Sequence, residues 1–320
     1  MPRYTRKSAI LAAKEATAGV DAAPTGAANA LLVSNQSINP LNATNVDRDN
    51  VRAYFGGSEQ LVGTAYKEVS FDIELAGSGT AGTAPPWGAL LCACGFAETT
   101  AATPARIEYT PITDNVPSVT IYYYMDGVLH KLLGARGNCE ISAGIGEIPK
   151  LKFTFQGIDG GDTVAATPAT TLSAFKTPVV INDANSGDVT LGGALAAGAV
   201  TGGQGYPGKG LSLSLGNEVQ FVPLTSSEGI DLTGRAVSGK VSLDLTPAQY
   251  VAAMADVKAN VVTTLSYQFG TQAGNIVLLF GPAVQRLSPS YEDYNGRAMA
   301  SYDLRFVPKS GNDELRLVLL

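Results

Sequence analysis

Two five-residue stretches, VSFDI at residues 69–73 and VSLDL at residues 241–245, decide the fold. In both, apolar and polar residues alternate, which is the period-two pattern of a β-strand with one buried face. The stretches lie 172 residues apart (241 − 69 = 172), and the features around them follow the same order. Each stretch comes after a strand and a polar loop, and each precedes a short helix, a long hairpin and a final alternating strand.

This repeated order predicts two tandem β units, over residues 29–160 and 210–320. The helices are expected at Pro85–Gly95 and Pro247–Ala255, because proline suits the first helical turn and glycine suits the stop. The hairpins are expected at 121–134, with an Asp126-Gly127 turn, and at 265–281. The final strands are expected at 151–155 and 302–306. The competing interpretation is an all-β chain with occasional helices and no true repeat.

The rest of the chain flanks these units. Residues 1–28 form an N-terminal arm, with a short helix expected over Ser8–Ala16, and an arm of this kind has to dock on something to fold. Residues 161–209 form a linker with short strands, expected at 177–182 and 188–191, and a turn at 185–187. The glycine-rich stretch 192–210 is expected to be featureless and mobile.

Composition and charge argue against several classes of protein. The 320 residues carry a net charge of −6, which argues against a sequence-independent nucleic-acid binder. Charged residues are only 16% of the chain, so much of its surface is expected to be covered by other copies or partners. No run approaches about 18 apolar residues, and Lys14 interrupts the apolar start too early for a signal peptide. The three cysteines are too few and too oddly placed for a disulfide framework, which favours a reducing compartment.

The chemistry-bearing side chains indicate no active site. The single histidine, His130, lies in a strand pattern, and Cys92 and Cys94 lack the CxxC spacing of a zinc site. The loop 203–210 comes close to a phosphate-binding loop, but Gly210 stands where serine or threonine should hold magnesium. Three carboxylates, Glu140, Glu292 and Asp293, give no sequence reason to pair as acid and base. We therefore predict no catalytic, cofactor-binding or metal-binding residues and no enzyme; a hydrolase with unpaired carboxylates is the weakest alternative.

Four stretches resemble the major tail tube proteins of bacteriophages with long, non-contractile tails. They are the opening from Pro2 to Val33, RAYFGGSEQLVG at 52–63, ELAGSGTAGTAPPWGALL at 74–91 with CGF at 94–96, and LSLGNEV at 213–219. The resemblance implies a mostly β fold of two tandem β-sandwich or barrel units, each flanked by a short α-helix. It also implies that strands of every unit join a continuous inner β-barrel in a ring.

The resemblance further implies a virion protein, made in the host cytoplasm, whose rings stack into the hollow tail tube. Family members with one unit per chain form hexameric rings, so a duplicated chain is expected to form trimers with pseudo-sixfold symmetry. A hexamer is expected instead if the second half is an appended domain. The implied partners are further copies, the tape measure protein, and the tail terminator and tail-tip proteins, with no membrane. The implied function is conduction of the genome, which passes through the lumen without specific binding.

Specific segments are candidates for these roles. The hairpins at 122–133 and 265–280 are candidate barrel strands, and a lumen of acidic or neutral side chains would let DNA slide. Residues 3–28 and 192–210 are candidate ring-to-ring contacts, and deleting residues 2–28 is expected to block stacking while leaving both units folded. The alternative function is a virion decoration or receptor-binding module, which would expose the aromatic run Tyr122–Tyr124 to a ligand.

Overall fold

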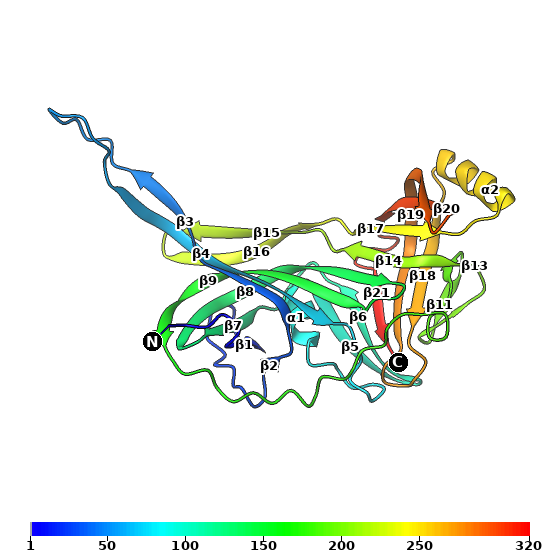
Figure 1. Cartoon of the computed structure of the whole chain (residues 1–320), viewed down its shortest axis with the longest axis horizontal. Coiled ribbons are helices and arrows are strands. Elements are labelled where there is room, and N and C mark those ends of the chain that lie inside the picture. Colours follow the sequence, from blue (N-terminus) through cyan, green and yellow to red (C-terminus); the bar gives the residue numbers. More distant parts are fainter. Residues whose placement is uncertain (1) are drawn as a thin grey trace.

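The computed structural model describes residues 2–320 as a mostly β chain with two short helices. Seventeen strands form one open sheet, and β11–β12 and β15–β16 form two small separate sheets. The molecule is elongated, with the β3–β4 hairpin at one end and α2 at the other (Figure 1). The elements are β1 (Ser8–Lys14), β2 (Ala30–Leu31), β3 (Ser34–Asp47), β4 (Gln60–Glu74), α1 (Gly88–Ala93), β5 (Phe96–Ala102), β6 (Ala105–Pro111), β7 (Val119–Met125), β8 (Val128–Gly144), β9 (Lys150–Val164), β10 (Val189–Leu191), β11 (Ala194–Ala196), β12 (Ala199–Thr201), β13 (Gln204–Tyr206), β14 (Gly208–Ser214), β15 (Asn217–Leu224), β16 (Ser227–Arg235), β17 (Ser238–Leu243), α2 (Pro247–Lys258), β18 (Val262–Phe269), β19 (Val277–Tyr294), β20 (Arg297–Phe306) and β21 (Arg316–Leu319).

The large sheet contains the same antiparallel strand order twice. Residues 8–164 pair in the order β3–β4–β9–β8–β7–β1. Residues 189–306 pair in the order β14–β17–β20–β19–β18–β10. VSFDI lies in β4 and VSLDL begins in β17, so the two stretches occupy corresponding strands. The helix α1 follows β4, and α2 follows β17.

Strand β14 joins these two groups of strands into one sheet. On one edge it pairs with β17, with Leu211 opposite Val241, and on the other edge it pairs with β8, with Leu211 opposite Ala143. Gly210 brings the two backbones close together: its φ is +108°, and an added Cβ would lie 2.0 Å from the carbonyl oxygen of Ala143. A second connection is made by β21, which pairs with β6 and with β19.

One contiguous hydrophobic core runs under both groups of strands. Its largest fully buried side chains include Trp87 on the approach to α1, Phe71 in β4, Phe153 in β9 and Tyr302 in β20. Phe71 and Phe153 face each other across neighbouring strands, with ring centroids 6.0 Å apart. The aromatic residues of the alternating strands therefore supply the core that the period-two pattern predicts.

The predicted helices and hairpin turns are present. Asp126 and Gly127 both have positive φ, +38° and +93°, as a two-residue type I′ hairpin turn requires. α2 starts with a capping box, in which the side chains of Thr246 and Gln249 satisfy each other's backbone N–H groups, and with Pro247 in the first turn. The backbone N–H of Gly95 bonds to the carbonyl of Cys92 just after α1, and its φ is +85°.

Two predictions in the flanking segments are wrong. Ser8–Ala16 is not helical, because β1 pairs along its whole length with β7 and buries Ile10 and Leu11 on opposite faces. This tertiary pairing overrides the helix propensity of an alanine-rich stretch. Residues 177–182 form no strand, whereas the turn that follows them and β10 are present where expected.

The glycine-rich stretch 192–210 is also more ordered than expected. It contains β11, β12, β13 and the start of β14. Its glycines supply turns between short strands, since Gly198, Gly202 and Gly203 all have positive φ. A glycine-rich composition is typical of mobile loops, but turns that need a positive φ also require glycine. The composition alone therefore does not separate the two cases.

The docked position of β1 changes what a deletion would do. Removing residues 2–28 would strip β7 of its outer neighbour and expose core side chains, so the first group of strands would not stay intact. Our expectation that this deletion leaves both units folded is therefore wrong. The exposed residues before β1, from Pro2 to Arg6, lie outside the strand, and Arg3 and Tyr4 donate hydrogen bonds to Met125 and Asp126 at the β7–β8 turn.

Candidate functional site

A row of polar side chains crosses the sheet at the place where β14 joins β8. The row runs over six neighbouring strands, and each residue stands directly opposite the next: Asp72, Lys152, Glu140, Ser214, Ser238 and Arg305. A second row lies two residues along the same strands: Glu74, Lys150, Ser142, Ser212, Lys240 and Asp303. We call these twelve residues the junction face.

The junction face is polar because it is the other side of strands whose alternate residues form the core. Ile141 and Leu213 are buried, whereas Glu140 and Ser212, which precede them in β8 and β14, are exposed. Strand alternation places the two sets on opposite faces. The face is hollowed into an open groove of about 480 Å³, whose lining includes Asp72, Glu140, Lys152 and Ser212.

The charges of the junction face balance, with four acidic and four basic residues. Opposite charges stand next to one another across the strands, and the Lys152 Nζ lies 3.0 Å from the Glu140 carboxylate. Cross-strand pairs of this kind stabilise a sheet modestly. They also leave a hydrated surface without a net field to hold a polyanion.

The aromatic run that a ligand-binding module would expose is buried. Tyr122, Tyr123 and Tyr124 lie in β7, between β1 and β8, and each is at most 9% exposed. Tyr123 belongs to the main core, and the other two pack in a smaller cluster with Leu11 and Leu129. These tyrosines therefore serve packing, and they offer no aromatic patch.

His130 belongs to an ion-pair cluster at one end of the sheet. Its Nδ1 lies 2.8 Å from Asp162, and the fully buried Lys67 reaches Asp162 at 2.5 Å and Asp159 at 2.6 Å. Burial raises the pKa of the Asp162 carboxyl, but hydrogen bonds from Lys67 and His130 outweigh it and hold the pKa below the ordinary value. The cluster satisfies the buried ammonium group of Lys67.

The cysteines are free, buried thiols. Burial raises the pKa of the Cys92 thiol to about 11 and that of Cys94 well above its ordinary value. Cys139 in β8 is raised by burial as well. A thiol with a raised pKa is a poor nucleophile and a poor metal ligand, so these side chains act as small core residues.

The three candidate carboxylates make separate contacts. Glu140 pairs with Lys152, whereas Glu292 pairs with Lys209 and accepts a 2.7 Å hydrogen bond from Ser242. The hydrogen bond from Lys209 is the main reason that the pKa of the Glu292 carboxyl lies below its ordinary value. Asp293 accepts from the backbone of the β19–β20 turn. No contact between them makes an acid–base pair.

The remaining sequence candidate, the loop 203–210, forms β13 and the start of β14 and offers no phosphate-binding helix. Within residues 2–320, no group of three or more His, Cys, Asp and Glu side chains is placed to hold a metal ion. In the same part of the chain, no helix combines the length and apolar character needed to span a membrane.

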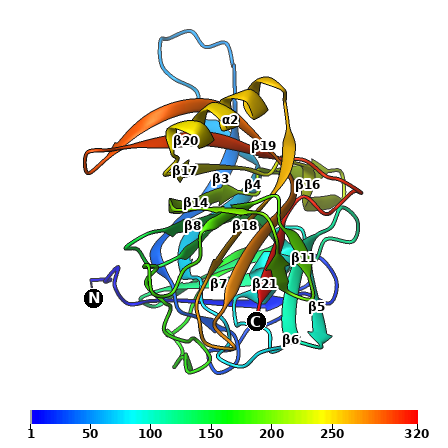
Figure 2. The same cartoon turned by 90° about the vertical axis from the view of Figure 1, so that its right-hand side faces the viewer.

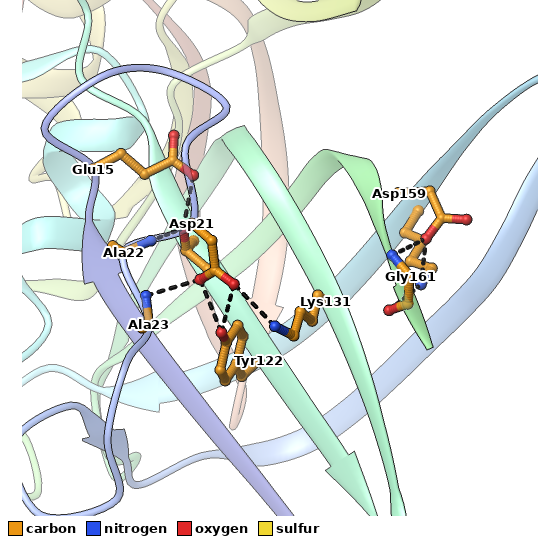
Figure 3. Close-up of polar contacts among 10 residues, drawn as sticks. Glu15, Asp21, Ala22, Ala23, Tyr122, Lys131, Asp159 and Gly161 are labelled. Carbon is orange, nitrogen blue, oxygen red and sulfur yellow. Dashed lines mark hydrogen bonds and ion pairs between the residues drawn. The ribbon is translucent and has the colours of Figure 1, made fainter. Parts of the chain in front are cut away.

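The N-terminal segment is tethered by two carboxylates. Asp21 accepts hydrogen bonds from the Tyr122 hydroxyl at 2.7 Å and from Lys131 at 2.9 Å, as Figure 3 shows. Burial opposes the ionised form of Asp21, but these hydrogen bonds prevail and lower its pKa. Glu15, almost fully buried, accepts from Ser118, Thr120 and the backbone N–H groups of Gly19 and Gly134, all between 2.6 and 2.8 Å.

Sequence reasoning missed the junction face. The alternation in KLKF at 150–153 and in LSLS at 211–214 marks which residues are exposed. It does not indicate that β14 and β8 are neighbours, and only that neighbourhood turns separate strands into one continuous polar surface.

Comparison with known proteins gives one result for nearly the whole chain. A family model described as "Phage tail tube protein" matches residues 5–307. The search of curated proteins finds no match. The matched range includes both groups of strands and β14 between them.

Proposed function

Because the chain belongs to the phage tail tube protein family, and is thus a structural protein of the virion tail that assembles with itself into a tube, we propose that three copies form each ring of that tube. The rings stack, and the viral genome passes through the lumen during ejection. The tail is of the long, non-contractile type. The protein acts as a structural element and not as an enzyme.

The observation that carries the proposal is the strand order that occurs twice in one chain and is joined by β14 on β8. We treat residues 29–160 and 210–320 as two tail-tube units, with 1–28 and 161–209 as the arm and the linker. If one junction between units already lies within the chain, three chains supply six units. A ring of three copies then has pseudo-sixfold symmetry, with covalent and non-covalent junctions alternating.

The junction face is our candidate for the wall of the lumen. It crosses from one unit to the next on a continuous sheet, as the wall of a multi-subunit barrel must. Its balanced charges suit a conduit for DNA, since a surface that neutralised phosphates would release counterions and bind. The tape measure protein occupies the lumen before ejection, and the tail terminator and tail-tip proteins close the two ends. Assembly takes place in the host cytoplasm.

Electron microscopy of the purified protein at high concentration, with averaged end-on views, tests the ring. Hollow rings with six lobes and the mass of three chains are expected. Six chains per ring would keep the tube function and refute the two-unit chain. A protein that forms neither rings nor tubes, even with a tail-tip complex added as initiator, would refute the proposed function.

Charge reversal tests the lumen. Phage carrying Glu140→Lys together with Asp72→Lys are expected to assemble tails and to eject DNA more slowly, because the junction face then gains net positive charge. The matched control is Glu228→Lys, an exposed acid near the start of β16, outside the junction face. Ejection at the wild-type rate by the double variant would contradict the placement of this face in the lumen.

A further inference from the structure

The junction inside the chain has a specific construction. β8 carries β9 along one edge, and on the other edge it carries first β7, over residues 128–135, and then β14, over residues 140–144. The contact is well packed: Leu211 and Leu213 of β14 and Ile141 and Ala143 of β8 are all buried.

The same junction also covers α1. The side chain of Asn217, just after β14, donates to the carbonyl of Cys94 at 2.7 Å and to that of Gly137 in β8 at 3.0 Å. Five of the six residues of α1 are buried. The side chain of Asn217 thus ties the residue that ends α1 to β8, which α1 also contacts.

Because the strand order is repeated, each residue of β8 at this junction has a corresponding residue in β19 of the second group. In the first group Phe71 faces Phe153, and Phe153 faces Cys139 of β8. In the second, Leu243 faces Ala300, and Ala300 faces Tyr291 of β19. Since VSFDI and VSLDL align Phe71 with Leu243, Tyr291 of β19 corresponds to Cys139 of β8.

In the second group, β19 corresponds to β8, but among the described residues no strand pairs with the edge of β19 that corresponds to the β14-binding edge of β8. β19 carries β18 only as far as Gln285, and its continuation to Tyr294 pairs on the other edge with β20. Within residues 2–320 no strand occupies the edge where β14 would stand. Cys139 is fully buried, whereas the corresponding Tyr291 is 69% exposed. Of the twelve residues of α2 only Ala253 is buried, and Val251 is 68% exposed. The helix lies on the outside of the strands, next to β19 (Figure 2).

In the first group, β3 is the strand that corresponds to β14. β3 pairs with β4, and its outer edge has no neighbour among the described residues. Ile38 stands opposite Val69, as Leu211 stands opposite Val241, so Ile38 corresponds to Leu211. The β3–β4 hairpin exposes four large apolar side chains, which would be stabilised by burial against a partner. They are Leu41, Val46, Leu61 and Val62.

We propose that β3 of one copy docks on the open edge of β19 of the next copy, in the register that β14 adopts on β8. Asn39 then stands opposite Tyr294, as Ser212 stands opposite Ser142, and the β3–β4 hairpin covers α2. This inference rests on the proposed ring and names the surface that closes it.

The occupant is a second copy of this chain for two reasons. The two surfaces lie at opposite ends of the molecule, so they cannot meet within one chain (Figure 1). They are also different surfaces, which makes the contact heterologous, and a heterologous contact closes into a ring when its rotation allows. The pairing removes two exposed sheet edges, which would otherwise promote aggregation.

Disulfide capture between two differently labelled copies tests the register. Asn39→Cys and Tyr294→Cys are made in separate chains, both at exposed positions, and mixed under oxidising conditions. Directly opposed residues of antiparallel strands have Cα atoms about 4.5–5.5 Å apart, within the range that a disulfide spans. The native cysteines are buried and do not compete. The control mixes Tyr294→Cys with Thr99→Cys, on β5.

The expected result is a covalent dimer, at least tenfold more abundant in the Asn39→Cys and Tyr294→Cys mixture than in the control or with either variant alone. The same samples are imaged by electron microscopy. Rings or tubes without the covalent dimer would overturn this inference and leave the proposed function standing. Cross-linking of Thr99→Cys in place of Asn39→Cys would assign the surface to another edge strand. Absence of rings from the wild type and the variants would overturn both proposals.

Discussion

Gly210→Ala is the substitution that tests most directly whether β14 holds the two groups of strands together. Gly210 lies near the start of β14, which follows β13 in the chain, and it stands opposite Gly144 of β8. Its φ of +108° lies in a region that residues with a Cβ rarely adopt. The added methyl group would also collide with backbone, 2.0 Å from the Ala143 oxygen and 2.8 Å from the Gly144 Cα.

The size of the effect follows from these two terms. A non-glycine residue held at a sparsely populated φ costs about 1–3 kcal/mol. Forcing a methyl group into a packed site costs a further 1–3 kcal/mol or so. The collision partners are backbone atoms of a paired strand, so no side chain can turn away to relieve it. We expect a loss of about 2–6 kcal/mol, against a total of roughly 5–15 kcal/mol for a natural domain.

Equilibrium urea unfolding measures the loss. Trp87, the only tryptophan, is buried beside α1 and reports on the first group of strands, while circular dichroism reports on the whole sheet. The matched control is Gly229→Ala in β16, where an added Cβ meets nothing within 4 Å and φ is not positive. The control is expected to change the unfolding free energy by less than about 1 kcal/mol. Equal unfolding midpoints for both variants would refute the argument about β14.

Two further substitutions address the tethered N-terminal segment. Glu15→Gln places an amide group against hydroxyl and N–H donors, and is expected to lower the unfolding free energy by about 3 kcal/mol in the same urea assay; a loss below about 0.5 kcal/mol would mean that residues 15–22 are not held by this carboxylate. Asp21→Asn is expected to cost about 1 kcal/mol at pH 7. Because the folded pKa of Asp21 lies below its ordinary 3.8, the stabilisation is present above that pH and is lost as the pH falls through the folded value. The difference in urea midpoint between wild type and Asp21→Asn should therefore shrink as the pH falls below 3.8, and an undiminished difference at the lowest pH would contradict the ionic account.

The sequence predicts the parts of the fold whose signals are local. VSFDI and VSLDL mark β4 and β17 by their own alternation, and the Asp126-Gly127 pair specifies its turn by its own φ preference. Pro247 marks the start of α2 because proline suits the first helical turn. Each of these elements forms where the pattern indicates, because the residues that determine it are neighbours in the chain.

The parts that sequence reasoning missed depend on distant partners. β1 is a strand because β7, more than a hundred residues later, pairs with it. β14 is a strand because β8 and β17 lie on its two sides, although its first residues read as a glycine-rich loop. The junction face has the same origin: alternation identifies Lys152 and Ser212 as exposed, but only the register between strands places them on one surface.

The pairing of β21 with β6 has a consequence for how the chain folds during synthesis. Tyr109 stands opposite Leu317, 208 residues further on (317 − 109 = 208). At a ribosomal rate of about 5–20 residues per second, the β5–β6 hairpin waits roughly 10–40 s for its partner strand. During that interval one edge of β6 has no partner strand, and contacts of such long sequence separation form slowly. The β5–β6 hairpin therefore gains its place in the large sheet only after β21 has been synthesised.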